Sequence, residues 1–245
     1  MNTLFKTLSP TQPLEPNTNH LRTFSMIVPA FTLLVSLAGV RAEAASVVSN
    51  LNNPLGDAWT IGSQDADLTD SPVANRFTTG SGPGWQLDSV VLNLGRFSGA
   101  TGSATGNIDV YLASDNNVAP GAVLTLFPSV APTTPTGTFT LTPQTPIVLA
   151  PNTSYWLVTS ANVDDAYIWN FTEDVSQTGL PGWTIFDTAF AGYPAGSWTP
   201  LILPPNASPA PTLFQVNATA VPEPGTILGL LAVGSLGALS RKRKG

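Results

Sequence analysis

The feature that most constrains the fold is an alternation of apolar and polar residues with a period of two. Successive side chains of a β-strand point to opposite faces, so this alternation indicates half-buried strands. Segments 87–94, 107–113 and 212–219 show it most clearly. Their inward-facing residues are expected to be Val90, Leu92 and Leu94; Ile108, Val110 and Leu112; and Phe214, Val216 and Ala218.

Further strands are expected along the rest of the chain, separated by turns rich in Gly, Pro and Asn. The expected segments are 58–61, 75–79, 122–127, 137–142, 146–150, 154–160, 166–172 and 183–190. The turns between them are expected at 80–84, 115–117, 120–121, 151–152 and 181–182. This pattern predicts an all-β fold over residues 45–220, an antiparallel β-sandwich of the jelly-roll kind.

The N-terminus reads as an export signal. Residues 26–40 form an apolar stretch, preceded by Lys6 and Arg22 and followed by the small-x-small triplet Ala42-Glu43-Ala44. We therefore expect a signal peptide over residues 1–44, with a helical apolar part and cleavage after Ala44. The alternative is a permanent anchor, but about 15 apolar residues fall short of the roughly 20 that a stable span needs.

The expected mature body is strongly acidic. Only Arg76 and Arg96 are basic between residues 45 and 221, against twelve acidic residues, which gives a net charge of −10. Such a body repels phosphate backbones, so nucleic-acid binding is excluded as a function class. The chain has no Cys, and its one His and two Met precede residue 45.

The missing residue types also exclude most catalytic chemistry. Without His, Cys, Met or Lys, the body has no Ser-His-Asp or Cys-His constellation, no lysine nucleophile and no usual zinc, copper or haem ligands. A glycosidase needs only two opposed carboxylates, for which Asp164-Asp165 and Glu173-Asp174 are the candidates. Sequence neighbours on a strand point to opposite faces, so we expect no enzymatic activity.

One motif is compatible with a bound metal. Asp65, Asp67 and Asp70 provide a D-x-D-x-x-D pattern of hard oxygen ligands, which suit Ca²⁺. The spacing differs from that of an EF-hand loop, and the alternative is an acidic surface loop. Structural calcium is therefore the only cofactor hypothesis, and otherwise no cofactor is expected.

Aromatic residues in 180–198 suggest a carbohydrate site. Trp183, Tyr193 and Trp198 lie in a stretch punctuated by Gly and Pro, and flat rings on a rigid scaffold could stack on sugars. The alternative is that these rings pack in the core or in loops. Trp156 and Trp169 are expected in the core.

The C-terminal 25 residues, 221–245, have three parts. Pro222-Glu223-Pro224 is followed by an apolar run over 226–240 and then by Arg241, Lys242, Arg243 and Lys244. The run is expected to form a short transmembrane helix of roughly 22 Å, less than the roughly 30 Å hydrocarbon core, which suits a transient anchor. The four basic residues would act as a cytoplasmic stop-transfer signal.

This three-part tail resembles the PEP-CTERM sorting signal of Gram-negative bacteria. The resemblance implies that an exosortase, a membrane cysteine transpeptidase, recognises Pro222, Glu223 and Pro224 and removes the tail near this motif. The protein would be anchored transiently in the inner membrane and then delivered to the outer surface or to the extracellular polysaccharide matrix.

The body resembles the choice-of-anchor R domain. The resemblance rests on segments 75–82, 87–94, 110–124 and 149–158 in that order, with Asp115-Asn116 before Pro120-Gly121 and the Tyr155-Trp156 pair. It implies a β-rich surface domain without known catalytic residues.

The sequence therefore predicts a non-enzymatic cell-surface protein with a structural or adhesive role. Its expected partners are an exosortase, the membrane and envelope or extracellular polysaccharides. The alternative is a carbohydrate-binding module with structural calcium. The sequence leaves open the ligand, the final attachment chemistry and the oligomeric state.

Overall fold

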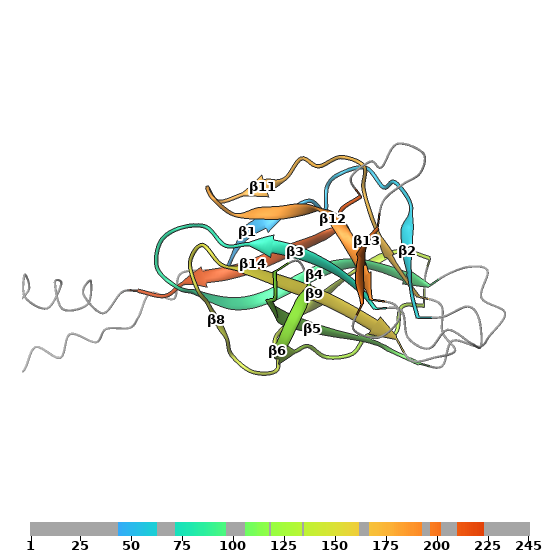
Figure 1. Cartoon of the computed structure of the whole chain (residues 1–245), viewed down its shortest axis with the longest axis horizontal. Coiled ribbons are helices and arrows are strands. Elements are labelled where there is room, and N and C mark those ends of the chain that lie inside the picture. The colour runs from blue at the N-terminus through green and yellow to red at the C-terminus, as the bar shows by residue number, and fades with distance from the viewer. Residues whose placement is uncertain are drawn as a thin grey trace, which may run out of the picture. The chain divides into compact units, whose positions relative to one another are not determined.

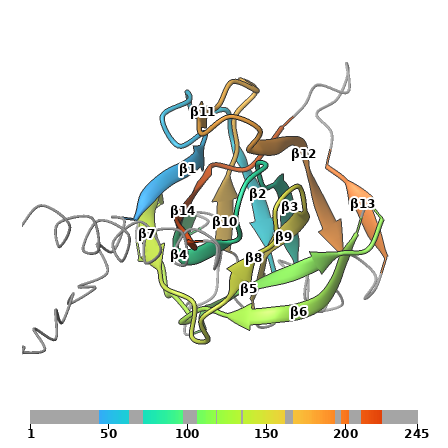
Figure 2. The same cartoon turned by 90° about the vertical axis from the view of Figure 1, so that its left-hand side faces the viewer.

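The computed structural model describes residues 44–62, 72–96, 106–117, 119–133, 135–161, 167–192, 197–201 and 210–222. The chain divides into two units, residues 1–40 and 41–245, and all the described residues belong to the second. They form two antiparallel β-sheets (Figures 1 and 2).

Sheet A is eight-stranded and has the order β11-β1-β14-β4-β10-β2, with β7 and β8 also paired to β4. Its strands are β1 (Ala45–Ser49), β2 (Ala58–Ile61), β4 (Trp85–Arg96), β7 (Gly137–Leu141), β8 (Val148–Leu149), β10 (Tyr167–Asn170), β11 (Thr178–Gly179) and β14 (Phe214–Ala220). The long strand β4 is central because it pairs with β14, β10, β7 and β8 along its length.

Sheet B is six-stranded and has the order β13-β12-β3-β9-β5-β6. Its strands are β3 (Val73–Thr78), β5 (Ile108–Asp115), β6 (Pro120–Leu126), β9 (Ser154–Ala161), β12 (Thr184–Gly192) and β13 (Trp198–Pro200). Figure 2 shows β1, β14 and β4 of sheet A on one side and β12 and β13 of sheet B on the other.

One hydrophobic core lies between the two sheets. Sheet A contributes residues such as Leu92, Trp169 and Phe214, and sheet B contributes Phe77 and Leu157, each of them fully buried. The alternation read from the sequence selects the correct inward face, because the nine residues expected to point inward are each at most 1 % exposed. Burial of these two faces is what makes a sandwich of the sheets.

The expected strands are confirmed, with end shifts of a few residues. Segment 146–150 is the weakest, since only Val148–Leu149 is strand. The alternation missed β1, β11 and β13, which have only five, two and three residues and are too short to show a clear period. Within the described ranges the chain contains no helix, and none of it is therefore suited to cross a membrane as a helix. The expected signal and C-terminal helices lie outside the described residues.

The turn residues behave as their chemistry requires. Asn117 and Asn152 have positive φ values of 62° and 49°, and Gly182 has a φ of 83°. Asn tolerates the left-handed region better than other residues that carry a Cβ, and Gly adopts it without strain. Three of the predicted turns are thus confirmed at the residues that make them.

A buried polar network fixes the segment that leads into β14. The Asn75 Oδ1 atom accepts hydrogen bonds from the Thr212 backbone N–H (2.8 Å) and hydroxyl (3.1 Å). The Asn50 Nδ2 atom donates to the Thr212 carbonyl at 2.9 Å, and its Oδ1 accepts from the Phe214 N–H at 2.9 Å. Two buried amides, one in β3 and one directly after β1, thereby satisfy the backbone N–H and C=O groups of Thr212 and the N–H of Phe214.

Candidate functional site

The start of β1 and the end of β14 lie next to each other, because these neighbouring strands of sheet A are antiparallel. Ala45, the first residue of β1, pairs with Ala218 near the end of β14. β14 continues to Ala220, which pairs with Trp85, and the Val221 N–H donates to the Gly84 carbonyl at 2.8 Å. Sheet pairing therefore begins at the residue after the expected cleavage site and persists up to the residue before Pro222 (Figure 1).

The sorting motif begins directly after β14. Pro222 is exposed and is the last described residue. Glu223 and Pro224, and the basic residues Arg241, Lys242, Arg243 and Lys244, lie outside the described residues. The exposed Pro222 shows that the motif begins where the sheet stops, with no spacer between them.

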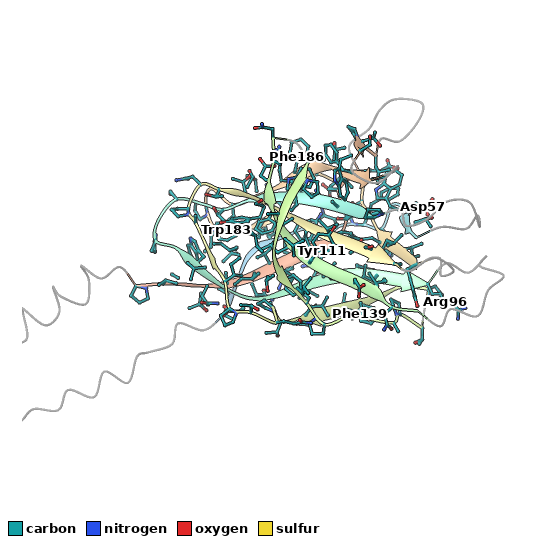
Figure 3. All side chains as sticks on the ribbon, turned by 60° about the horizontal axis from the view of Figure 1, so that its bottom comes forward. Asp57, Arg96, Tyr111, Phe139, Trp183 and Phe186 are labelled. Carbon is teal, nitrogen blue, oxygen red and sulfur yellow. The ribbon has the colours of Figure 1, made fainter. Side chains whose placement is uncertain are left out.

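The proposed glycan-binding tryptophan Trp183 is a core residue. It is 4 % exposed, stacks at 6.3 Å on Phe77 and meets Trp85 edge-on at 5.5 Å, both distances being between ring centroids. With 4 % of the residue exposed, a sugar cannot stack on its ring, and the interpretation of Trp183 as a sugar platform is wrong. Figure 3 labels Trp183 together with Phe186. The core alternative describes it correctly.

The two other aromatic candidates have different fates. Tyr193 lies outside the described residues. Trp198 of β13 is half-buried and packs against a second, smaller hydrophobic cluster that includes Trp156 and Phe190. Trp156 was expected in the main core, and it is fully buried, but it belongs to this smaller cluster on the outer face of sheet B.

Only two of the candidate carboxylate residues are among the described residues. Asp65, Asp67 and Asp70 lie outside them, as do Asp164 and Asp165. Glu173 and Asp174 are exposed neighbours in a loop. In the described part of the chain, no three His, Cys, Asp or Glu residues are grouped closely enough to hold a metal ion.

A cation held between aromatic rings forms the centre of the outer face of sheet B. The Arg76 guanidinium lies 4.3 Å from the Phe186 ring centroid and 5.7 Å from that of Trp156. Its Nη1 atom is 3.8 Å from Asp115 Oδ1, which also accepts a 2.6 Å hydrogen bond from the Trp156 indole. Such contacts hold Arg76 and both rings in fixed positions.

A pocket opens beside Phe186. Its volume is about 330 Å³, within the usual range for small-ligand sites. Its lining comes from the end of β3, the start of β12 and the loop before β11, through Thr78, Val175, Gln177, Thr184, Ile185 and Phe186. Among the described lining residues no side chain is formally charged, and together they combine one aromatic ring with hydroxyl and amide groups.

The loop wall of this pocket is held in place by hydrogen bonds. Asn53 Nδ2 donates to the carbonyls of Asp174 (2.8 Å) and Ser176 (2.7 Å). The Gln177 Oε1 atom accepts the Ile185 N–H at 2.5 Å. Hydrogen bonds from the Ser176 backbone and side chain keep the pKa of Asp174 below its ordinary value of 3.8. The wall is therefore organised before any ligand arrives.

The sequence signals for this pocket are weak. Segment 183–190 was expected as a strand and forms one, but it is apolar on both faces. Trp183 and Ile185 pack in the main core, whereas Phe186 and Phe190 belong to the outer face. The sequence identified Arg76 only as one of the two basic residues of the expected body. Its neighbour Trp156 is brought opposite it by the β3–β9 register, 80 residues away in the chain.

The comparison with family models identifies the tail. The model for the PEP-CTERM protein-sorting motif matches residues 220–244. None of the curated proteins and none of the solved structures compared with the chain matches it. The chain thus carries a PEP-CTERM motif, and this motif implies a protein that an exosortase sorts to the cell surface or exterior of a Gram-negative bacterium.

Proposed function

We propose that the protein is a non-enzymatic exosortase substrate whose acidic β-sandwich has a structural or adhesive role at the outer surface or in the extracellular polysaccharide matrix. The observation that carries this proposal is the junction of the matched motif at 220–244 with a β-sheet that is paired up to Val221. A folded body that ends at a processing signal is what a sorted passenger domain requires.

The arrangement of the two ends supports an export sequence of events. Residues 1–44 act as a cleaved signal peptide with a helical apolar part, and 226–240 form the short transmembrane helix that is removed with the tail. Because Ala45 and Ala218 are paired, the first and last strands of the body begin and end side by side. The expected cut after Ala44 and the sorting motif therefore adjoin neighbouring positions of the body.

Several narrower features belong to the same proposal. The body is of the choice-of-anchor R kind and jelly-roll-like, it uses no catalytic residues, and Asp65, Asp67 and Asp70 are its candidate site for structural calcium. Calcium bound only by the folded state would raise the melting temperature, and a chelator would lower it. An unchanged melting temperature would remove calcium from the proposal.

Intact-mass measurement of fractionated cells, with and without the exosortase, tests the central proposal. With the enzyme, we expect a surface or medium product that begins at Ala45 and ends near Pro222–Pro224. Without it, the product should keep Arg241 to Lys244 and stay with the inner membrane. A product that keeps its basic end in the presence of the enzyme would contradict the proposal. Adhesion is tested separately by a pull-down of the protein with purified polysaccharide.

The second candidate function is a carbohydrate-binding module. The pocket beside Phe186 favours it, since its mixed lining of ring, hydroxyl and amide groups suits a ligand that is itself both apolar and hydroxylated. This candidate is compatible with sorting to a polysaccharide matrix. It no longer depends on Trp183, which is buried.

A further inference from the structure

We propose that the pocket beside Phe186 binds one ring of a neutral glycan, with Phe186 as the aromatic contact and with Gln177 and Thr78 as polar contacts. The inference rests on the proposed adhesive role at the cell surface and gives it a ligand class and a place. It assigns the glycan to the start of β12 instead of to the tryptophans that the sequence suggested.

The chemistry of the lining selects the ligand class. A sugar ring offers apolar C–H faces and hydroxyl groups around its edge. Phe186, Ile185 and Val175 provide apolar surface, while Thr78, Thr184 and Gln177 provide hydrogen-bonding groups. None of the described lining residues is charged, and Arg76, which lies against Phe186, is paired with Asp115 at 3.8 Å. The lining therefore favours a neutral sugar over a uronic acid or an amino sugar.

The aromatic ring is held in place for binding. Arg76 lies against Phe186, with its guanidinium carbon 4.3 Å from the ring centroid. The Phe186 carbonyl accepts a 3.0 Å hydrogen bond from the Nδ2 atom of the fully buried Asn75. Side chain and backbone of Phe186 are thus fixed from two directions, which lowers the entropy lost on binding.

The amide of Gln177 is oriented in the same way. Its Oε1 atom is used by the Ile185 N–H at 2.5 Å, which leaves the Nε2 group as the donor side of the amide. Thr78 is paired with Ser154 through a 2.8 Å contact between hydroxyl oxygens, so its Oγ1 can still exchange one further hydrogen bond with a ligand. A hydroxyl-rich ligand meets both a donor and an acceptor here.

The test is affinity electrophoresis of the full chain, purified from cells in mild detergent. The gels contain dextran, a mannan or a galactan as neutral glycans, and alginate as a polyuronate. We expect retention by at least one neutral glycan and none by alginate. Phe186→Ala should weaken retention at least about tenfold, whereas Phe186→Tyr should stay within about threefold of the unmodified chain.

Gln177→Glu separates binding from folding. Glutamate keeps the acceptor for the Ile185 N–H but loses the Nε2 donor and adds a charge, so retention should fall about tenfold with an unchanged melting temperature. Leu126→Ala is the matched control, since Leu126 is 50 % exposed on β6 of the same sheet and lies outside the pocket; its retention should not change. Any loss of folding by Phe186→Ala leaves the Gln177 comparison intact.

Three results would overturn the proposal: retention by alginate alone, retention by none of the four glycans, or equal retention of the Gln177→Glu variant and the unmodified chain. Because binding is measured on the unprocessed chain, these results say nothing against sorting. Conversely, failure of the exosortase cut leaves glycan retention measurable.

Discussion

Replacement of Asn75 is the sharpest test of how the body is held together. Asn75 is fully buried in β3, and its side chain makes contacts of 2.8 and 3.1 Å with the N–H and hydroxyl of Thr212 and of 3.0 Å with the Phe186 carbonyl. In Asn75→Ala these three groups lose their partner inside the sandwich. Each buried polar group left without a partner costs about 1–3 kcal/mol.

The Thr212 hydroxyl can rotate, so the main loss comes from the backbone N–H and carbonyl. We therefore expect Asn75→Ala to lower the free energy of unfolding by about 3–5 kcal/mol. This is a large share of the roughly 5–15 kcal/mol that holds a typical protein folded. For a chain of this size, a loss near 4 kcal/mol lowers Tm by about 8–16 °C.

The assay is urea and thermal unfolding of the full chain followed by tryptophan fluorescence. Asn217→Ala is the matched control, because Asn217 is only half-buried in β14. Its side chain donates to Ser89 Oγ (2.9 Å) and accepts from Gln215 Nε2 (2.7 Å), and both bonds are only part-buried. We expect it to lose less than about 1 kcal/mol. If Asn75→Ala lowered the free energy of unfolding no more than this control does, the buried amide would not be what holds β3, β12 and the segment at Thr212 together.

Three further predictions follow from the ends, the core and the pocket wall. Insertion of a Gly-Ser spacer between Ala220 and Val221 should speed the exosortase cut in pulse–chase experiments, because the sheet is paired up to Val221 and crowds the motif; an unchanged or slower cut would show that the junction is already accessible. Trp183→Ala should lower the free energy of unfolding by about 3–5 kcal/mol through the lost core contacts, measured by urea unfolding, and a loss below about 1 kcal/mol would contradict its place in the core. Hydrogen bonds from Ser176 depress the pKa of Asp174, so the ionised carboxylate stabilises the loop above the unfolded-state pKa of 3.8, and this contribution disappears as the pH falls through the lower folded-state pKa. Hydrogen-exchange protection of the Ser176 amide should therefore be constant from pH 7 to about 5 and drop only below about pH 4. A drop in protection already near pH 6 would assign the protection to another group.

The alternation of apolar and polar residues predicted most of the strands and their inward faces, because a sandwich buries one face of each strand. Ile108, Val110 and Leu112 could be placed inward without knowing any strand partner. The alternation missed β1, β11 and β13, which are short. It predicted β12 as a strand, but it could not tell which face of that strand is buried, because both faces are apolar.

The candidate site was predictable only in part. The sorting motif is a local signal of consecutive residues, and it is matched at 220–244. The pocket instead joins Thr78, Gln177 and Phe186, which lie in three separate segments. Trp183 and Phe186 are three residues apart, so alternation places them on opposite faces of the predicted strand. Because both are aromatic, the sequence does not say which of them lies in the core.

The sequence alone determined the strand-rich class, the acidic charge of the body and the address at its C-terminus, because periodicity, charge and contiguous motifs are properties of neighbours in the chain. Only the tertiary structure decided which aromatic rings are buried, which amides are buried, and that the start of β1 lies beside the end of β14. Those facts depend on strand register and sheet order, which are set by contacts between residues as distant as Asn50 and Thr212.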